Sequence, residues 1–236
     1  MNPNDLFFDS KGNLNDINFA NKAVSRSSEA IGIISKEGIV LAVTKDNFSM
    51  ENSYNTSTTR IFLIDAHITC VVSGLVPDAN FLINQARMSA QHYKKTFQEM
   101  IPVKKIVDEI CQIKYHFTTK SSNRLFGVSF LIAGWDGIGA PIIYKTDPDG
   151  RFWSFYAIAI GHDSIFNQDL LSETIEKNLT IFRAIGIVIN ILSIKYNYFD
   201  LGNILEISIL RKNPRDEIYI NVLSKKIIKN FLNNKN

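Results

Sequence analysis

In the first third of the chain, apolar residues occur in short runs of the length of β-strands. Two apolar runs, residues 30–34 and 39–45, flank the polar stretch Ser35-Lys36-Glu37-Gly38. Such a pair with a glycine-containing turn is typical of a β-hairpin. A second pair follows at residues 60–64 and 67–73, with its turn at Asp65-Ala66. The first third of the chain therefore predicts four antiparallel strands.

The apolar period then changes from two residues to three or four. Apolar positions recur at helical spacing from Ala79 to Phe97. Pro77 suits the first turn of this helix, and Asp78 complements its positive end. After Pro102 a second helix shows one apolar stripe that ends at Phe117. Because each helix offers a single apolar face, both are expected to pack on a sheet.

The second half repeats the same order of strands followed by helices. Strands are predicted at residues 126–134, 141–146, 152–160, 204–211 and 217–223. Asp147-Pro148-Asp149-Gly150 is a strong turn signal between two of them. Helices are predicted at residues 164–177 and 180–196 and from Ser224 onward. The helix at residues 180–196 is apolar almost all round, which suits a position between layers.

The order of elements favours one domain over residues 1–236. No linker, internal repeat or long low-complexity stretch divides the chain. Two groups of strands, each followed by a pair of helices, predict an α+β fold in which two antiparallel sheets stack and helices cover both outer faces.

Composition and charge narrow the class of protein. The chain has 236 residues, of which 45% are hydrophobic and 21% charged, as in an ordinary globular protein. A formal charge of +3 gives no electrostatic case for binding nucleic acid. The carboxyl-terminal lysines 225, 226, 229 and 235 are expected to form a solvated helix face.

The chain also lacks the signals of a secreted or membrane protein. Residues 1–9 contain no basic segment followed by an apolar core, so no signal peptide is expected. The most apolar stretch, residues 179–194, contains Arg183 and Asn190 and is short for a membrane span, which favours a core helix. Cys70 and Cys111 lie in apolar periodic segments and are expected to be buried, reduced thiols, as in the cytosol or nucleus.

The usual motifs of a metal or cofactor site are absent from the sequence. His67, His92, His116 and His162 do not pair with Cys, Asp or Glu at zinc-ligand spacing. The fragment at residues 137–139 has the first half of a dinucleotide-binding motif, but no helix follows it. We find no nucleophile elbow, phosphate loop or Ser/His/Asp set. No metal and no cofactor is therefore expected.

Several segments resemble one known family, the proteasome alpha subunits. They read SGLVPDANFLINQAR at residues 73–87, FGVSFLIAGWD at 126–136, YKTDPDG at 144–150 and AIAIG at 157–161. The resemblance runs from Phe8 to the carboxyl-terminal helix. AQHY, QEMIP and GWD, between residues 90 and 136, look closest to the type 4 subunit, at the alpha-3 ring position. IDAHI at residues 64–68 looks more like a different paralogue.

The resemblance implies a fold and a cellular setting. The fold is the four-layer αββα sandwich of the amino-terminal-nucleophile hydrolases, with residues 1–29 as an amino-terminal tail and ring helix. The partners are other alpha and beta subunits of the 20S proteasome, in a stack of seven-membered rings, and the carboxyl-terminal tails of regulatory-particle ATPases. The role is in ubiquitin- and ATP-dependent protein degradation in cytoplasm and nucleus, without contact to nucleic acid or membrane.

The same resemblance implies that the chain is not an enzyme. Catalytic beta subunits use a free amino-terminal Thr, an acid and a Lys, and these positions fall near Ser28, near Thr44 and at Arg60. Ser28 is internal, Thr44 carries no negative charge, and Arg60 does not give up a proton. No catalytic residue is therefore expected. Two alternatives stay open: an active threonine or serine peptidase of this fold, and a binding module outside the proteasome.

A docking pocket for activator tails is the chemistry that the resemblance implies instead. In alpha subunits a basic residue pairs with the tail carboxylate near a Gly-Leu pair, and Arg60, Gly74 and Leu75 match these positions. Arg in place of the usual Lys keeps the charge and adds a bidentate fork. The alternative is that Arg60 is a surface residue at a strand end.

The amino-terminal gate motifs of the family are only partly present. Phe8 and Gly12 match, whereas Ser10 stands for Pro, Asn18 for Glu and Phe19 for Tyr. Each lost hydrogen bond removes about 0.5–1.5 kcal/mol of preference for an ordered open gate. Sequence drift and altered gating both explain the pattern.

Overall fold

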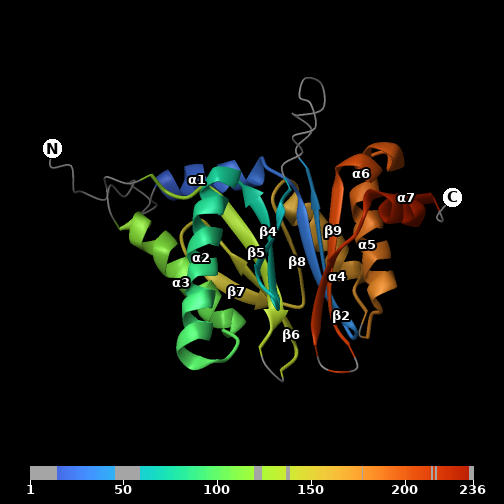
Figure 1. The fold of residues 1–236 in the computed structure, drawn as a ribbon. Coiled ribbons are helices and arrows are strands. Elements are labelled where there is room, and N and C mark those ends of the chain that lie inside the picture. Colours follow the sequence, from blue (N-terminus) through green and yellow to red (C-terminus); the bar gives the residue numbers. More distant parts are fainter. Residues whose placement is uncertain are drawn as a thin grey trace.

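Two five-stranded antiparallel sheets stack face to face between two layers of helices (Figure 1). The computed structural model describes residues 15–45, 59–119, 124–136, 139–176, 178–213, 215 and 217–233. Sheet 1 has the strand order β10-β9-β2-β1-β8, and sheet 2 has the order β3-β4-β5-β6-β7. The predicted four-layer αββα fold is therefore confirmed.

The elements have the following bounds. Sheet 1 contains β1 (Ala30–Ser35), β2 (Gly38–Thr44), β8 (Ala157–Ile160), β9 (Leu205–Lys212) and β10 (Ile218–Val222). Sheet 2 contains β3 (Ile61–Asp65), β4 (Ile68–Gly74), β5 (Val128–Trp135), β6 (Pro141–Thr146) and β7 (Phe152–Phe155). The helices are α1 (Asn15–Ser25), α2 (Val76–Phe97), α3 (Val103–Thr118), α4 (Ser164–Thr174), α5 (Ile181–Ser193), α6 (Tyr198–Ile204) and α7 (Lys225–Asn233).

Strand alternation divides the interior into three apolar cores. On β2, Val40 and Ala42 face the helices, whereas Ile39, Leu41 and Val43 face the other sheet. Because side chains alternate between the two faces of a strand, one apolar run supplies two cores. Central strands such as β1, β2 and β5 are consequently apolar at most positions although the sheets are antiparallel.

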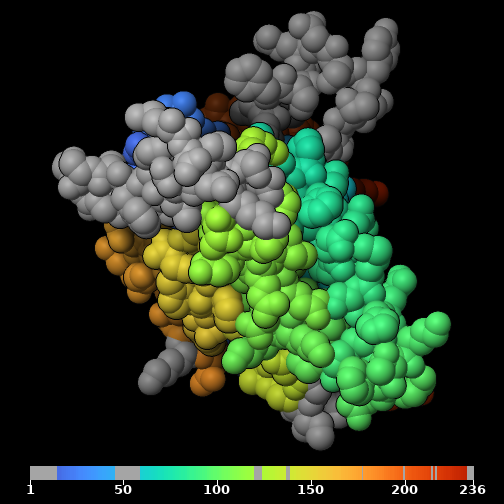
Figure 2. Space-filling model, turned by 90° about the vertical axis from the view of Figure 1, so that its left-hand side faces the viewer, coloured from blue at the N-terminus to red at the C-terminus, as the bar shows by residue number. Residues whose placement is uncertain are grey.

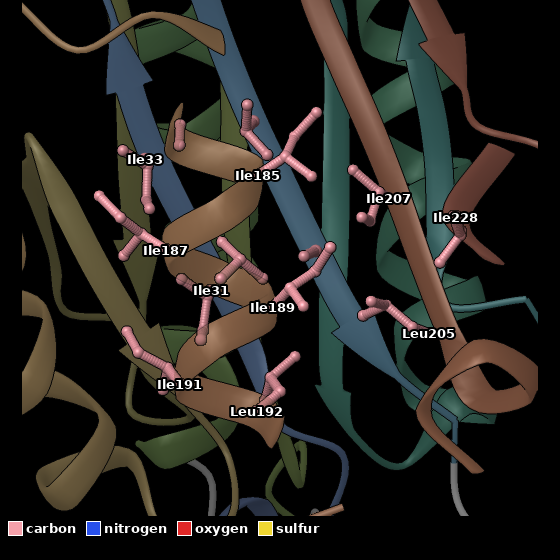
Figure 3. Close-up of a cluster of buried hydrophobic side chains, with 14 of the residues drawn as sticks. Ile31, Ile33, Ile185, Ile187, Ile189, Ile191, Leu192, Leu205, Ile207 and Ile228 are labelled. Atoms are coloured by element: carbon pink, nitrogen blue, oxygen red, sulfur yellow. The ribbon is translucent and has the colours of Figure 1, made fainter. Parts of the chain in front are cut away.

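Helix α5 forms the centre of the outer core on sheet 1. Its isoleucines, among them Ile185, Ile187 and Ile189, lie close to Ile31 and Ile33 of β1 (Figure 3). This helix is apolar on most of its surface because it packs on the sheet and also against α4 and α6. The predicted position between layers is wrong, because α5 belongs to an outer layer and exposes Phe182, Arg183 and Asn190 to solvent.

Helices α2 and α3 cover the outer face of sheet 2 (Figure 2). Buried side chains of both, including Leu82, Ile83, Ile106 and Ile110, pack on that sheet. Cys70 and Cys111 lie in this core as free thiols, as predicted, and burial raises the pKa of each to about 12. Among the described helices, none combines the length and apolar character that crossing a membrane requires.

One predicted strand, residues 152–160, is in fact two. The chain leaves sheet 2 after Phe155 and enters sheet 1 at Ala157, so that β7 pairs with β6 and β8 pairs with β1. Tyr156, which is 46% exposed, is the crossing residue, and its carbonyl accepts a hydrogen bond from Ile34 N at 2.9 Å. The apolar pattern continues through the crossing, so periodicity alone did not reveal it.

Helix α6 was also missed. Its seven residues are shorter than the stretch over which a helical period can be recognised.

Lys114 of α3 is a fully buried lysine in the core of sheet 2. Its ammonium donates hydrogen bonds to Val128 O and Thr146 Oγ1, both at 2.9 Å, and to Asp147 O at 3.2 Å. It also lies 4.8 Å from the centroid of the Phe130 ring. Burial lowers the pKa of Lys114 to about 8. The side chain thus ties α3 to two strands and to the turn that follows β6.

The lowered pKa of Lys114 predicts a specific pH dependence of stability. Between about pH 8 and the ordinary lysine pKa near 10.4, Lys114 is protonated in the unfolded chain but largely neutral in the folded chain. The free energy of unfolding therefore rises with pH in this window. We expect the free energy of unfolding of the wild type, relative to Lys114→Met, to rise through this window by at most about 1.4 kcal/mol per pH unit. Urea unfolding at pH 7.5 and 9.5 measures it. Lys104→Met, an exposed site on the same helix, is the control, and a pH-independent difference for Lys114→Met would disprove the assignment.

Candidate functional site

The junction between α1 and β1 contains Ser28, near which the resemblance places the nucleophile of catalytic subunits. Ser28 is 4% exposed, and its carbonyl accepts a hydrogen bond from Ser73 Oγ at 2.8 Å. Gly161, with φ of +91°, packs directly over this carbonyl, since a Cβ there would lie 2.0 Å from the oxygen. Ser28 is joined to α1 through Ser27, so its nitrogen is a peptide nitrogen and not a free amine. Such a nitrogen does not serve as a base.

The other two catalytic positions also hold structural contacts. Thr44 Oγ1 accepts a hydrogen bond from Glu29 N at 3.1 Å, and Thr44 N donates to Glu29 O at 2.9 Å. Arg60 donates from its guanidinium to Gly74 O at 3.1 Å. The hydroxyl of Thr44 therefore stabilises the pairing at the end of the hairpin and supplies no negative charge.

A network of charged side chains surrounds Glu29, beside Ser28. Glu29 is 2% exposed, and its carboxylate accepts hydrogen bonds from Lys195 Nζ at 2.6 Å, Tyr196 OH at 3.2 Å and Asn167 Nδ2 at 3.4 Å. A buried carboxylate is tolerated only where such partners compensate its loss of water. The network joins the start of β1 to α4 and to the end of α5.

Lys195 is the centre of this network. Its ammonium also lies 2.9 Å from His162 Nδ1 and 3.0 Å from Asp163 Oδ2. Partial burial opposes the charge of Lys195, but hydrogen bonds to Glu29 and Asp163 outweigh it and raise the pKa of Lys195 above its ordinary value. The hydrogen bond from Lys195 lowers the pKa of Asp163. Both groups are therefore held in their charged forms.

The same cluster has the composition of a metal site but already contains a cation. Glu29, His162 and Asp163 each offer one atom that could bind a metal, and these three atoms lie within 4.8 Å of one another. The Lys195 ammonium, at most 3.0 Å from all three, occupies the place that a metal ion would take. The arrangement is explained by Lys195, and it gives no support for a metal.

The structure brings together the three residues predicted for the docking pocket, Arg60, Gly74 and Leu75. The Arg60 guanidinium contacts the carbonyl of Gly74, and Leu75, 45% exposed, follows at the start of α2. Gly74 has φ of +119° and lies against Gly127 O, where a Cβ would come within 2.1 Å. Arg60 itself is only 4% exposed, so the alternative of a surface residue at a strand end is wrong.

Ser27 connects this group to the α1–β1 junction. Its hydroxyl accepts a hydrogen bond from Gly74 N at 2.9 Å and lies 3.3 Å from Gly74 O. Gly74 O is also the acceptor for Arg60. The end of α1 and the end of β4 are thereby fixed to each other beside the exposed Leu75.

Of the five residues predicted for the amino-terminal gate, two are described by the structure. Asn18 and Phe19 lie exposed on α1, with Phe19 64% exposed and Lys22 Nζ 5.7 Å from the centroid of its ring. Phe8, Ser10 and Gly12 lie outside the described residues. Their role stays a prediction.

The Glu29–Lys195 network was missed in the sequence. The available signal was a charged residue at each end of an apolar segment: Glu29 before β1 and Lys195 after α5. Because these positions are 166 residues apart, local patterning gave no reason to pair them.

Comparison with known proteins agrees with this geometry. A family model described as proteasome subunit matches residues 24–203, which include every residue of the two sites above. Proteasome subunit alpha type-4 of Spinacia oleracea is 37% identical over 186 residues, which cover 79% of this chain and 74% of the relative. Type-4-A of Arabidopsis thaliana is 36% identical with the same coverage. Alpha type-4 of Petunia hybrida is 36% identical over 79% of this chain and 75% of its own.

Removing the ammonium of Lys195 is expected to destabilise the fold. Breaking a buried ion pair by deleting one partner costs about 3–5 kcal/mol, and the 39% exposure of Lys195 reduces this to about 2 kcal/mol. Chemical denaturation of Lys195→Met measures the loss, with exposed Lys94→Met as the control. Adding Glu29→Gln to Lys195→Met should restore part of the stability. Equal stability of the Lys195 and Lys94 variants would show that the network contributes nothing.

Proposed function

The chain belongs to the proteasome subunit family as an alpha-type member, and from this premise we propose that it is a non-catalytic subunit of the outer alpha ring of the 20S proteasome. Its proposed contributions are to assembly of the core particle, docking of activators and gating of substrate entry. These place it in ubiquitin- and ATP-dependent protein degradation. The proposed location, cytoplasm and nucleus, follows from that role.

The environment of Ser28 is the single observation that carries the non-catalytic assignment. An amino-terminal nucleophile needs a free α-amine, an acid and a basic group of adjustable pKa. Here the backbone nitrogen of Ser28 is in a peptide bond after α1, Thr44 has a neutral side chain, and Arg60 keeps its proton. The burial of Ser28 beneath Gly161 further supports a structural role.

The proposed partners are other alpha and beta subunits in a seven-membered ring stack. The type-4 relatives support the alpha-3 position within the ring. Two exposed sets of apolar side chains support contacts with neighbouring subunits: Phe19 on α1, and Met88, Phe97 and Met100 on α2 and just after it, each more than half exposed. Exposed apolar side chains of this size are typical of protein interfaces.

The proposed docking site consists of Arg60, Gly74 and Leu75. The Arg60 charge lies directly beneath the Gly74 carbonyl, and the exposed Leu75 offers an apolar contact beside it. The carboxyl-terminal tail of a regulatory-particle ATPase carries an apolar residue, which would contact Leu75, and a carboxylate, which would pair with Arg60. A largely buried cation attracts a carboxylate more strongly than a solvated one, because less water screens the pair.

The proposed contribution to gating is weaker than in typical alpha subunits. Phe19 has no hydroxyl and Asn18 has no carboxylate, so α1 lacks two groups that order the open gate in the family pattern. The exposed position of both residues on α1 is compatible with a contact to a neighbour. Other ring members would then hold most of the open arrangement.

The docking proposal predicts a specific loss of tail binding. In particles assembled with Arg60→Ala, we expect a photo-crosslinking peptide ending in hydrophobic-Tyr-any to label this chain with about tenfold or more weaker apparent affinity, since a charge-assisted hydrogen bond contributes about 1.5–3 kcal/mol. Arg60→Lys should keep most of the binding because it keeps the charge.

Arg211→Ala, at an exposed site on β9, is the matched control and should label as the wild type does. Unchanged labelling of Arg60→Ala would disprove the docking role. Loss of labelling in Arg211→Ala as well would mean that general positive charge, and not this pocket, attracts the tail.

A further inference from the structure

Glu206 joins sheet 1 to the start of sheet 2. It lies on β9, opposite Val43 of β2. Its carboxylate accepts hydrogen bonds from the backbone N–H of Arg60 at 3.0 Å and from Thr59 Oγ1 at 3.3 Å, and its other oxygen lies 3.0 Å from Lys45 Nζ. One carboxylate of sheet 1 therefore binds the residues that lead into β3 of sheet 2.

These contacts hold the backbone of Arg60 from two sides. Strand β3 is at the edge of sheet 2, with β4 as its neighbour. The carbonyl of Arg60 accepts a hydrogen bond from Val72 N of β4 at 3.0 Å, and its N–H donates to Glu206. An edge strand without such an anchor has one side of its backbone unpaired. Because its N–H and its carbonyl are both bonded, the backbone of Arg60 is held in place. Its guanidinium then donates a hydrogen bond to Gly74 O at 3.1 Å.

Because Glu206 is paired with Lys45, it does not cancel the positive charge of Arg60. Lys45 pairs with Glu206, and both side chains are mostly buried, with 14% and 15% exposed. Two cations and one anion give the three residues a net charge of about +1. The carboxylate can therefore hold the backbone of Arg60 without neutralising the site for an incoming anion.

We propose that Glu206 is a positioning residue for recognition of a partner's carboxyl-terminal carboxylate at Arg60. This inference rests on the proposed docking role of Arg60 and adds the residue that orients it. Recognition of a planar carboxylate by a guanidinium depends on the direction of its N–H groups. A misplacement of about 1 Å weakens such a site even when the charge remains.

Two conservative variants separate positioning from charge. Glu206→Asp keeps the charge and the partner of Lys45 but draws the acceptor away from the N–H of Arg60. Lys45→Met removes the ion pair but leaves the carboxylate of Glu206 in contact with Arg60. Both are tested in assembled particles with the photo-crosslinking tail peptide, once with a free carboxylate and once with a carboxamide end. The measured quantity is the ratio of the two apparent affinities, which a general loss of stability does not change.

We expect the preference for carboxylate to fall at least fivefold in Glu206→Asp and to fall clearly less in Lys45→Met, which lowers the local charge but leaves the Glu206 carboxylate on the N–H of Arg60. Glu217→Ala, at an exposed glutamate just before β10, is the control and should match the wild type. Retained preference in Glu206→Asp, or an equal fall in Lys45→Met, would overturn the positioning role. If Arg60→Ala keeps the preference, the docking proposal itself fails, whereas loss in Arg60→Ala with retention in Glu206→Asp defeats only the role of Glu206.

Discussion

The buried carboxylate of Glu29 fixes the place where the chain passes from α1 into β1. Its partners Lys195 and Tyr196 come from the far end of the sequence, so the first strand is anchored to the helical layer on sheet 1. In the two residues before it, Ser28 is covered by Gly161 and Ser27 is bonded to Gly74. Because a buried charge without its partner is costly, this crossing has little freedom to rearrange. The burial of Ser28 and the location of the Gly74 group both depend on it.

The same crossing lies beside both places on which the proposed function rests, the buried Ser28 and the group of Arg60 and Gly74. In the proposed non-catalytic role Ser28 needs no free amine, and in the structure it follows α1, which ends at Ser25, and is buried. Arg60 contacts Gly74 O beside the exposed Leu75. Both sheets are buried on their two faces, which holds these positions in place relative to one another. The proposed docking pocket and the proposed inactivity of Ser28 thus depend on one backbone arrangement.

Most of the fold was predictable because its signals are local. The hairpin of β1 and β2, the single apolar faces of α2 and α3, and the turn after Asp147 all follow from spacing within about twenty residues. What could not be predicted depends on contacts between distant segments: the crossing at Tyr156, the burial of Arg60, and the hydrogen bond from Arg60 N, just before β3, to Glu206 of the other sheet. The residues of the proposed docking site were found through resemblance, whereas no local pattern singled out Glu29 or Glu206.

The claim that this chain is an uncleaved structural member of a proteasome ring is tested most directly by native mass spectrometry of the particle that purifies with it. The account predicts a particle of 20S size containing other alpha and beta subunits. On dissociation, the chain should be released with the peptide bond between Ser27 and Ser28 intact. A chain that appears as a free monomer, or one cut so that Ser27 or Ser28 becomes the amino terminus, would contradict it.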